Sequence, residues 1–570
     1  MELFKKIKNN KNIFVLLLTT TFFISCTSDY TDVDTDTDGT TVAPLDLLLT
    51  NTQVSLKNIN DFNNYTGTLL SVYTHQTTAR EEQDQYGVRA DNANLQNDWD
   101  ALYLNLTDIE TLIKQGTESG DLVYVGIAQM EKAYLLSVAV DLWGDVPYTE
   151  AIKLKDGVIS PKFDNQKDIY TAIFALIKTA KTNIASNAGA KKPAKDDLFY
   201  GGDTSKWIKF ANSFQLKLYN QVRLTDIFDQ AGFNALVAEN NFFTSLADDF
   251  QFVHTKNQTP NDERNSYFLE SYNSTQFSTY QSPWFYEILK GMNPTIHTNN
   301  PDPRIPYYFF NQLTAGEFPP DQGDQATGDP NADYWDKSTG FFTIRFGSTG
   351  PDRDHSAESS YTYPGIFPTG GRFDDGEGFS LSTLSAGSGT GVAPHRIFTY
   401  AEFLYVQAEL ILTGKLSGDV TAKLREALEA SFAKVDQVVK NSGSTQSIPV
   451  LVGSPAVTTF IDNIITEFTA ASADKKLEII MTQKWVATYG DPMDQYTDYR
   501  RTGYPVLANP LSTTKEYQLN NGDGFPLNDS QTVQNNPFQQ SFYWPQNELN
   551  SNQNAPAQKN PGTYKIFWSK

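Results

Sequence analysis

Apolar residues recur at helical spacing in two long stretches of the chain, and this pattern restricts the fold more than any other feature. In the first stretch, from about 43 to 240, steps of three and four place apolar residues on one helical stripe: Leu95, Trp99, Leu102, Leu106, Ile109 and Ile113. The same spacing predicts further helices at about 122–142, 167–186, 204–224, 398–414, 420–440, 457–472 and 474–490. We therefore expect an all-α scaffold of helices paired through turns.

Two parts of the chain lack this period. Residues 246–395 mix glycine, proline, asparagine and serine with aromatic residues, and the tail 506–570 is rich in asparagine, proline and aromatic residues. We expect one domain over 43–570, in which helices at 43–245 and 396–505 support a loop-rich excursion with little regular structure and an irregular tail. Loops held by a rigid scaffold commonly carry ligand sites.

The N-terminus has the form of an export signal. A basic head precedes the apolar run Ile13–Leu18, which is too short for the ~20 residues that a membrane span needs. The only cysteine of the chain follows at Cys26, and the order Phe23-Ile24-Ser25-Cys26 resembles the lipobox of bacterial lipoproteins. That resemblance implies a signal peptide at 1–25 and an acylated Cys26; the alternative is an ordinary secretory signal with a chance cysteine.

An acidic segment follows the cysteine. Residues 26–42 carry five aspartates and few apolar side chains, which is typical of a tether rather than of a core, and the segment resembles the surface-export signals of some Gram-negative lipoproteins. Asp34, Asp36, Asp38 and Gly39 also fit the start of a calcium loop, but the twelfth position is Leu45 instead of glutamate. We interpret the segment as a tether.

Composition and missing motifs exclude several functions. The net charge of −22, from 45 basic and 67 acidic residues, disfavours nucleic-acid binding. The five histidines are scattered, and neither a phosphate loop, a dinucleotide fingerprint nor a G-x-S-x-G elbow occurs, so we expect no metal and no cofactor. A surface glycoside hydrolase is the remaining enzyme hypothesis, with Asp374, Asp375 and Glu377 as candidate carboxylates.

Six strings along the chain carry a family resemblance. They are DLWGDVPYTEA (141–151), YGGDTSKWIKFANSFQLKL (200–218), DPRIPYYF (302–309), TYAEFLYVQAELILTG (399–414), QKWVATYGDPMDQYTDYRRTGYP (483–505) and FYWPQNELNSN (542–552). In this order, and together with the lipobox, they resemble the segments of the SusD/RagB family of lipid-anchored nutrient-binding proteins. The resemblance covers nearly the whole chain and is strongest to the SusD-like subgroup.

The resemblance implies both a fold and a function. The fold would be four tetratricopeptide-like helix pairs in an αα superhelix beside a looped region. The protein would lie on the outer face of the outer membrane, capture oligosaccharides for polysaccharide utilisation, and pass them to a SusC-like TonB-dependent transporter. No family member is known as an enzyme, so we expect binding without catalysis; peptide capture is the alternative within the same uptake system.

The motifs do not mark a ligand site, so candidate contacts follow from chemistry. Sugar rings stack on aromatic faces, and their hydroxyls pair with planar polar groups. Residues 75–97 offer Arg80, Tyr86, Arg89 and Asn92, and the central excursion offers Trp284 and Trp335. We expect a site formed by 75–97 with parts of 280–380, in which Trp284, Trp335 and Tyr86 stack and the arginines donate. Four tryptophans on apolar stripes are assigned to the core: Trp99, Trp143, Trp207 and Trp485.

Overall fold

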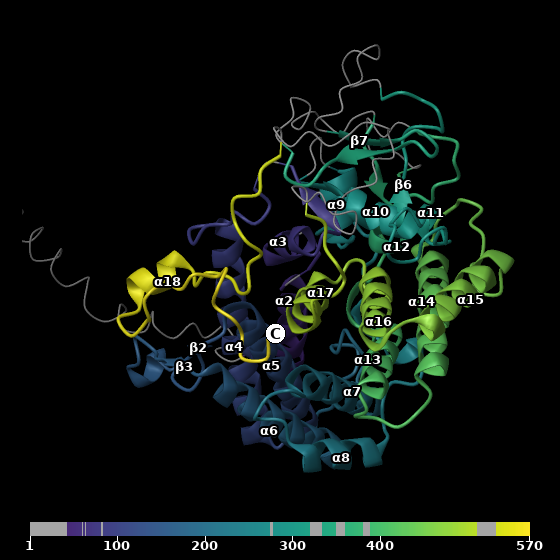
Figure 1. Cartoon of the computed structure of the whole chain (residues 1–570). Coiled ribbons are helices and arrows are strands. Elements are labelled where there is room, and N and C mark those ends of the chain that lie inside the picture. Colours follow the sequence, from purple (N-terminus) through teal and green to yellow (C-terminus); the bar gives the residue numbers. More distant parts are fainter. Residues whose placement is uncertain are drawn as a thin grey trace, which may run out of the picture.

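The computed structural model describes residues 43–59, 61–62, 64–80, 84–273, 278–319, 333–348, 360–379, 388–509 and 532–570. In these ranges the chain forms seventeen α-helices and ten short strands (Figure 1). The all-α class is therefore confirmed. None of the helices in the described ranges combines the length and the apolar character that a membrane crossing requires.

The first half of the scaffold is built around one buried helix. The helices are α2 (Leu45–Asn58), α3 (Thr66–Tyr73), α4 (Ala93–Ser119), α5 (Leu122–Trp143), α6 (Gln166–Ser186), α7 (Thr204–Val222) and α8 (Gln230–Glu239). Helix α5 is apolar nearly all round and packs against α4 and α6, which is why it lies in the interior. Gly126 permits the close contact with α6, because a Cβ there would lie 2.8 Å from the Ala180 carbonyl oxygen.

The second half repeats the helix pairing. It consists of α13 (Tyr400–Leu412), α14 (Val420–Ser442), α15 (Pro455–Ala470), α16 (Ala473–Ala487) and α17 (Pro492–Thr502). Each of α14, α15 and α16 packs against the helix before it, and α13 also packs against α16 and α7, so the two halves meet at α7 and α13. Every scaffold helix predicted from apolar spacing is present, with ends within a few residues.

The central excursion consists of short elements. They are η2 (Leu246–Asp248), β4 (Phe250–Phe252), α9 (Ser266–Tyr272), β5 (Thr279–Gln281), α10 (Pro283–Lys290), α11 (Ile305–Tyr308), β6 (Phe309–Phe310), β7 (Asp333–Asp336), β8 (Phe341–Ile344), β9 (Tyr363–Pro364), α12 (Ile366–Thr369) and β10 (His395–Phe398). The strands pair antiparallel in twos: β1 (Thr77–Ala79) with β5, β10 with β4, β6 with β9, and β7 with β8. In Figure 1 α9 to α12 and β6 and β7 gather at the upper end of the molecule.

The C-terminal tail packs on the end of α5. Its only helix in the described ranges is α18 (Gln546–Ser551). The Phe542 amide donates to the Leu142 carbonyl (2.7 Å), and the Trp544 indole donates to the Asp145 carbonyl (2.9 Å). Between α5 and α6, β2 (Val146–Pro147), η1 (Leu154–Asp156) and β3 (Phe163–Asp164) form a hairpin-like connection.

The hydrophobic core contains the four tryptophans assigned to it. Trp143, Trp207 and Trp485 are at most 1% exposed and Trp99 is 4% exposed. One cluster spans α2 to α8 and the tail, a second spans α10 to α16, and a smaller one lies under α9 and β8. The second cluster joins α10 to α12 of the excursion to the scaffold helices α13 to α16, so the excursion is packed on the scaffold through a shared core.

Candidate functional site

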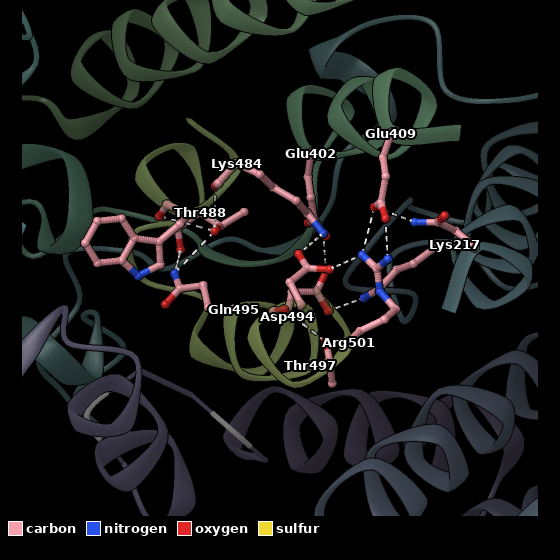
Figure 2. Close-up of polar contacts among 12 residues, drawn as sticks. Lys217, Glu402, Glu409, Lys484, Thr488, Asp494, Gln495, Thr497 and Arg501 are labelled. Carbon is pink, nitrogen blue, oxygen red and sulfur yellow. Dashed lines mark hydrogen bonds and ion pairs between the residues drawn. The ribbon is translucent and has the colours of Figure 1, made fainter. Parts of the chain in front are cut away.

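Charged residues from three of the six motif strings meet inside the scaffold rather than on its surface. Figure 2 shows several of them pointing toward one another from α7, α13, α16 and α17. We call this set the ion network; it consists of Lys217, Arg223, Glu402, Glu409, Lys484, Asp491, Asp494, Asp498 and Arg501. All of its side chains are largely or fully buried, so a solute outside the protein does not reach them.

Glu409 is the shared partner of two arginines in this network. Arg223 lies 2.8 Å from one oxygen of Glu409, and Arg501 binds both oxygens, at 2.7 Å on Oε2. The Asn220 amide also donates to Oε2 (2.8 Å). Burial alone would raise the pKa of Glu409, but Arg501 and Arg223 lower it to about 2. The carboxylate is therefore held ionised.

A second part of the network joins three acids to two lysines. Burial, and then the neighbouring Asp494 carboxylate, raise the pKa of Glu402 well above its ordinary value. Lys217 pairs with Asp494, while Lys484 lies 2.7 Å from Asp498 and 3.5 Å from Glu402.

Three carboxyl groups of the ion network lie as close together as the ligands of a metal ion would. Single carboxylate oxygens of Glu402, Asp491 and Asp494 lie within 4.8 Å of one another. Lys217 and Lys484 already bring positive charge to these oxygens, so the arrangement is that of internal ion pairs. The network therefore positions helices, and the ligand site must lie elsewhere.

Two other motif strings also have structural roles. In DPRIPYYF, Asp302 and Arg304 form a buried bidentate pair, and Arg304 also donates to Ser431 (2.7 Å) and Gln483 (3.0 Å). In DLWGDVPYTEA, Gly144 adopts a φ of +77°, and a Cβ there would lie 2.6 Å from the Tyr564 ring. The residues of these two motifs therefore hold neighbouring segments of the chain together.

The two segments expected to form the ligand face do lie side by side. Strand β1, from residues 77–79, pairs with β5, and the Arg80 amide donates to the Ser278 carbonyl (3.1 Å). The Thr343 hydroxyl of β8 donates to the Gln281 carbonyl of β5 (2.6 Å), and β8 pairs with β7. Residues 77–80, 278–281 and 333–344 therefore form one continuous region, which we call the β1–β5–β8 face. Most of its side chains are buried, and its exposed or half-buried members include Arg80, Ser278, Trp335 and residues 337–339.

Two of the aromatic rings expected to stack on a ligand are core residues. Trp284 in α10 is 1% exposed, and its indole donates to the Val506 carbonyl (3.0 Å). Tyr86 is 4% exposed, and its hydroxyl shares a hydrogen bond with His75 Nε2 (2.8 Å). Neither ring presents a face to solvent, so the expectation that they form stacking platforms is corrected: both rings pack in the interior.

The other four candidates remain accessible to different degrees. The Arg89 side chain is 81% exposed and pairs only loosely with Asp91 (3.2 Å). Arg80 is half-buried, and Asn92 is half-buried and caps α4 by accepting from the Asn94 amide (2.9 Å). Trp335 in β7 is half-buried and packs edge-on against Phe318 (5.3 Å between ring centroids). Trp335 and Arg80 belong to the β1–β5–β8 face, and Arg89 and Asn92 follow it along the chain.

The remaining candidates are either engaged or outside the described residues. Asp374 accepts from Asn311 (2.8 Å) and from the Gly376 amide (3.0 Å), and burial raises its pKa to about 6. Asp375 accepts from the Glu377 amide (3.2 Å) within the same turn. Cys26 and the possible calcium loop at 34–45 lie outside the described residues, apart from the start of α2.

Comparison with known proteins places the chain in a family. A SusD-like family model, described as starch-binding and associating with the outer membrane, matches residues 37–338 and 343–526. No curated protein matches the chain.

Solved structures share its architecture. The chain is similar to a chitin-binding protein (19% identity, TM-score 0.64), with 92% of this chain and 100% of that chain covered. It is also similar to a SusD homologue from Bacteroides fragilis (18% identity, TM-score 0.63, 93% and 100% covered) and to a SusD-like protein from Bacteroides thetaiotaomicron (21% identity, TM-score 0.56, 92% and 99% covered). At these identities the structural likeness shows the fold alone. Because the family match spans most of the sequence, the chain belongs to the SusD-like family.

Proposed function

We propose that the protein captures glycans at the outer surface of the outer membrane and delivers them to a partner TonB-dependent transporter. The observation that carries the proposal is the family match over residues 37–338 and 343–526, because that family is described as starch-binding and associating with the outer membrane. The similarity of the fold to a chitin-binding protein along its full length supports a polysaccharide ligand.

The β1–β5–β8 face is the proposed place of capture. Arg80 and Arg89 would donate to sugar hydroxyls, Asn92 would pair with a hydroxyl through the amide nitrogen that its capping role leaves available, and Trp335 would supply an aromatic surface.

The proposed anchor is Cys26. Two or three acyl chains hold a protein stably on a membrane, so the acidic chain needs no electrostatic attraction to lipid. Metabolic labelling with a palmitate analogue should label the wild-type protein and not Cys26→Ala. Label on Cys26→Ala would contradict the anchor and leave glycan binding untouched.

A ligand screen tests the function. We expect affinity electrophoresis and calorimetry against soluble starch, chitin oligosaccharides and other glycans to give one saturable class of ligand, with no shorter products after prolonged incubation. Products of hydrolysis would favour the glycoside hydrolase hypothesis instead. A peptide that saturates the protein when no glycan does would replace the glycan by a peptide in the same uptake role.

A further inference from the structure

The most exposed aromatic residue of the described chain lies in the loop-rich excursion. Phe379 is 39% exposed, more than any other aromatic residue in the ranges that the structure describes. It ends the described part of the loop 370–379, which follows α12. Moving an apolar ring out of water is favourable. Phe379 is therefore available to a ligand that covers it.

The Phe379 ring is held in position by a neighbouring cation. The Arg372 guanidinium lies over this ring, 4.6 Å from its centroid, and over Phe310 of the core, at 5.0 Å. The Phe379 amide donates to the Gln312 carbonyl (3.2 Å). Because the guanidinium covers one face of the ring, the other face and the edges carry the exposed area. A ligand would meet a ring already in position, which reduces the entropy lost on binding.

The loop that carries the ring is fastened to the segments on both sides of it. The Phe373 amide donates to the Gln446 side chain, which in turn donates to the Phe373 carbonyl (3.0 Å each). Gly378 adopts a φ of +65°, and a Cβ there would lie 2.9 Å from the Gln312 carbonyl oxygen, so the two backbones approach as closely as only glycine permits. The loop therefore has a defined geometry before any ligand binds.

Residues 312–318 join this ring to the β1–β5–β8 face. One end of the segment binds the Phe379 amide, and at the other end Phe318 packs on Trp335 (5.3 Å between ring centroids). Both Trp335 and Phe379 also border the core cluster under α9 and β8, Trp335 directly and Phe379 through Arg372. So short a segment spans at most about 25 Å. Phe379 and Trp335 therefore lie on adjoining parts of the excursion.

Exposed carboxylates accompany the ring. Asp375 and Glu377 precede it in the same loop, and Glu317 lies in the adjoining segment; all three are exposed. An ionised carboxylate only accepts hydrogen bonds, and such bonds are stronger than those between neutral groups. A sugar ring offers both matching parts, a C–H face for the phenyl ring and hydroxyl donors for the acids. A protein partner that packed apolar surface on Phe379 would instead leave these carboxylates covered and unpaired, which is unfavourable.

Charge restricts the kind of glycan. Residues 312–318 and 372–379 carry four carboxyls and one guanidinium, and the adjoining β7–β8 turn adds Lys337, whose carbonyl accepts from the Gly316 amide (2.8 Å). The guanidinium, that of Arg372, already lies 3.8 Å from a carboxyl of the same loop. The region therefore has an excess of negative charge, as the whole chain has. A glycan with carboxylate or sulfate groups would be repelled, whereas a neutral glycan or an amino sugar would not.

We propose that Phe379 is a stacking platform of the glycan site and that Asp375 and Glu377 accept hydroxyl groups of the stacked sugar, so that the site takes neutral or amino-sugar glycans and rejects acidic ones. This inference rests on the proposed function, because it names the ligand class of the same site. It extends the place of capture from the half-buried Trp335 to a ring that is more exposed.

Affinity electrophoresis and calorimetry of the purified protein test the ring. The probes are soluble starch, chitin oligosaccharides and chitosan oligosaccharides, with polygalacturonate as the acidic glycan. The wild-type protein should bind at least one of the first three and not polygalacturonate. For the glycan that binds, Phe379→Ala should weaken the affinity about tenfold. Leu224→Ala, which shortens an exposed side chain (82% exposed) in the connection between α7 and α8, should leave the affinity unchanged.

A matched pair of ligands tests the carboxylates. The neutral glycan that binds is compared with its derivative in which the primary hydroxyls are oxidised to carboxylates. The wild-type protein should bind the derivative about tenfold or more weakly than the parent glycan. The double variant Asp375→Asn with Glu377→Gln should reduce this difference about threefold, and so should salt at about 0.5 M. Asp462→Asn, which removes an exposed carboxylate from α15, should not reduce it.

The outcomes separate this inference from the proposed function. Glycan binding that is unchanged in Phe379→Ala, or saturable binding of polygalacturonate, would overturn the inference and leave glycan capture in place. Binding of no glycan by the wild-type protein would contradict both. Phe379→Leu separates stacking from folding, because leucine keeps an apolar contact with Arg372 but has no aromatic face. It should melt as the wild-type protein does and still bind the glycan about fivefold more weakly. Full affinity in Phe379→Leu would assign the ring to loop packing and refute the proposal.

Discussion

Glu409→Gln is expected to be among the most destabilising single substitutions in the scaffold. Glu409 is 1% exposed and is the common partner of Arg223 and Arg501, which are 8% and 7% exposed. Glutamine has nearly the same shape but carries no charge, and its amide group would turn a donor toward one of the guanidinium groups. Arg223 and Arg501 would then lose the carboxylate that they share, and Asp498 would remain as a partner of Arg501.

The pKa of Glu409 sets the size of the effect. It falls from the ordinary value of 4.5 to about 2 in the folded chain, because Arg501 and Arg223 outweigh the effect of burial. One pKa unit corresponds to about 1.4 kcal/mol, so the ionised carboxylate contributes roughly 3 kcal/mol to folding. Breaking a buried ion pair costs ~3–5 kcal/mol, which agrees. This contribution is fully present above pH 4.5 and is lost as the pH falls toward 2.

Urea unfolding followed by tryptophan fluorescence measures this loss. At neutral pH the free energy of unfolding of Glu409→Gln should be lower than that of the wild-type protein by ~3–5 kcal/mol, and the difference should shrink below about pH 4. Asp462→Asn is the control, since its ion pair with Arg425 is exposed (56% and 38%) and should contribute less than ~1 kcal/mol. A loss below ~1 kcal/mol for Glu409→Gln would refute the assignment of the ion network as a stabilising element.

Three further predictions concern burial, strain and the ligand face. Burial raises the pKa of Glu131 in α5 from 4.5 to about 8, so the free energy of unfolding of the wild-type protein should fall as pH rises from 4.5 to 8. In urea unfolding, Glu131→Gln should lack this dependence and should gain stability relative to the wild-type protein as the pH approaches 8. Ile152→Asn should raise the melting temperature, by a stabilisation of ~1 kcal/mol, because asparagine accepts a positive φ; an unchanged or lower value would contradict strain at this residue. Trp284→Ala should lower the free energy of unfolding by ~3–5 kcal/mol, because this ring is buried. Trp335→Ala should change the free energy of unfolding by less than ~1 kcal/mol and weaken glycan binding about tenfold. Equal glycan affinity in Trp335→Ala and the wild-type protein would show that this ring is not part of the site.

Apolar spacing predicted the scaffold well because most scaffold helices bury apolar stripes. No separate helix was predicted at α2, α3, α8 or α17, and α17 differs from the predicted helices in the residues that it buries. Its buried stripe is charged: Asp494, Asp498 and Arg501 follow one another in steps of four and three, which is helical spacing, and all three lie in the ion network. A search for charged as well as apolar residues at this spacing would have found both the helix and the network. Glu402 and Glu409, seven residues apart within α13, carry the same signal.

Two of the segments expected to form the ligand face lie side by side, whereas two of the three aromatic residues expected to stack there are buried. The pairing of residues 77–79 with 279–281 brings the two expected segments together. Whether a ring there is exposed depends on distant parts of the chain, and the sequence near the ring does not reveal them. Ser282 caps α10 and Pro283 is its first residue, so the local sequence indicates the helix that carries Trp284. The hydrogen bond of its buried indole is made to the Val506 carbonyl, which lies far along the chain. The expectation that the Trp284 ring lies at the surface was therefore wrong.

The ion network also explains how a loop-rich excursion can rest on a scaffold of fixed geometry. Apolar surfaces are not directional, so helices packed only by them can shift along one another at little cost. The contacts of Lys217 with Asp494, of Asn220 with Glu409 and of Lys484 with Asp498 join α7, α13, α16 and α17 at defined positions. A shift of any of these helices by one turn would leave a buried charge without its partner, at a cost of several kcal/mol. We infer that the network fixes the alignment of the two scaffold halves, so that the β1–β5–β8 face stands on a base that changes in its loops do not disturb.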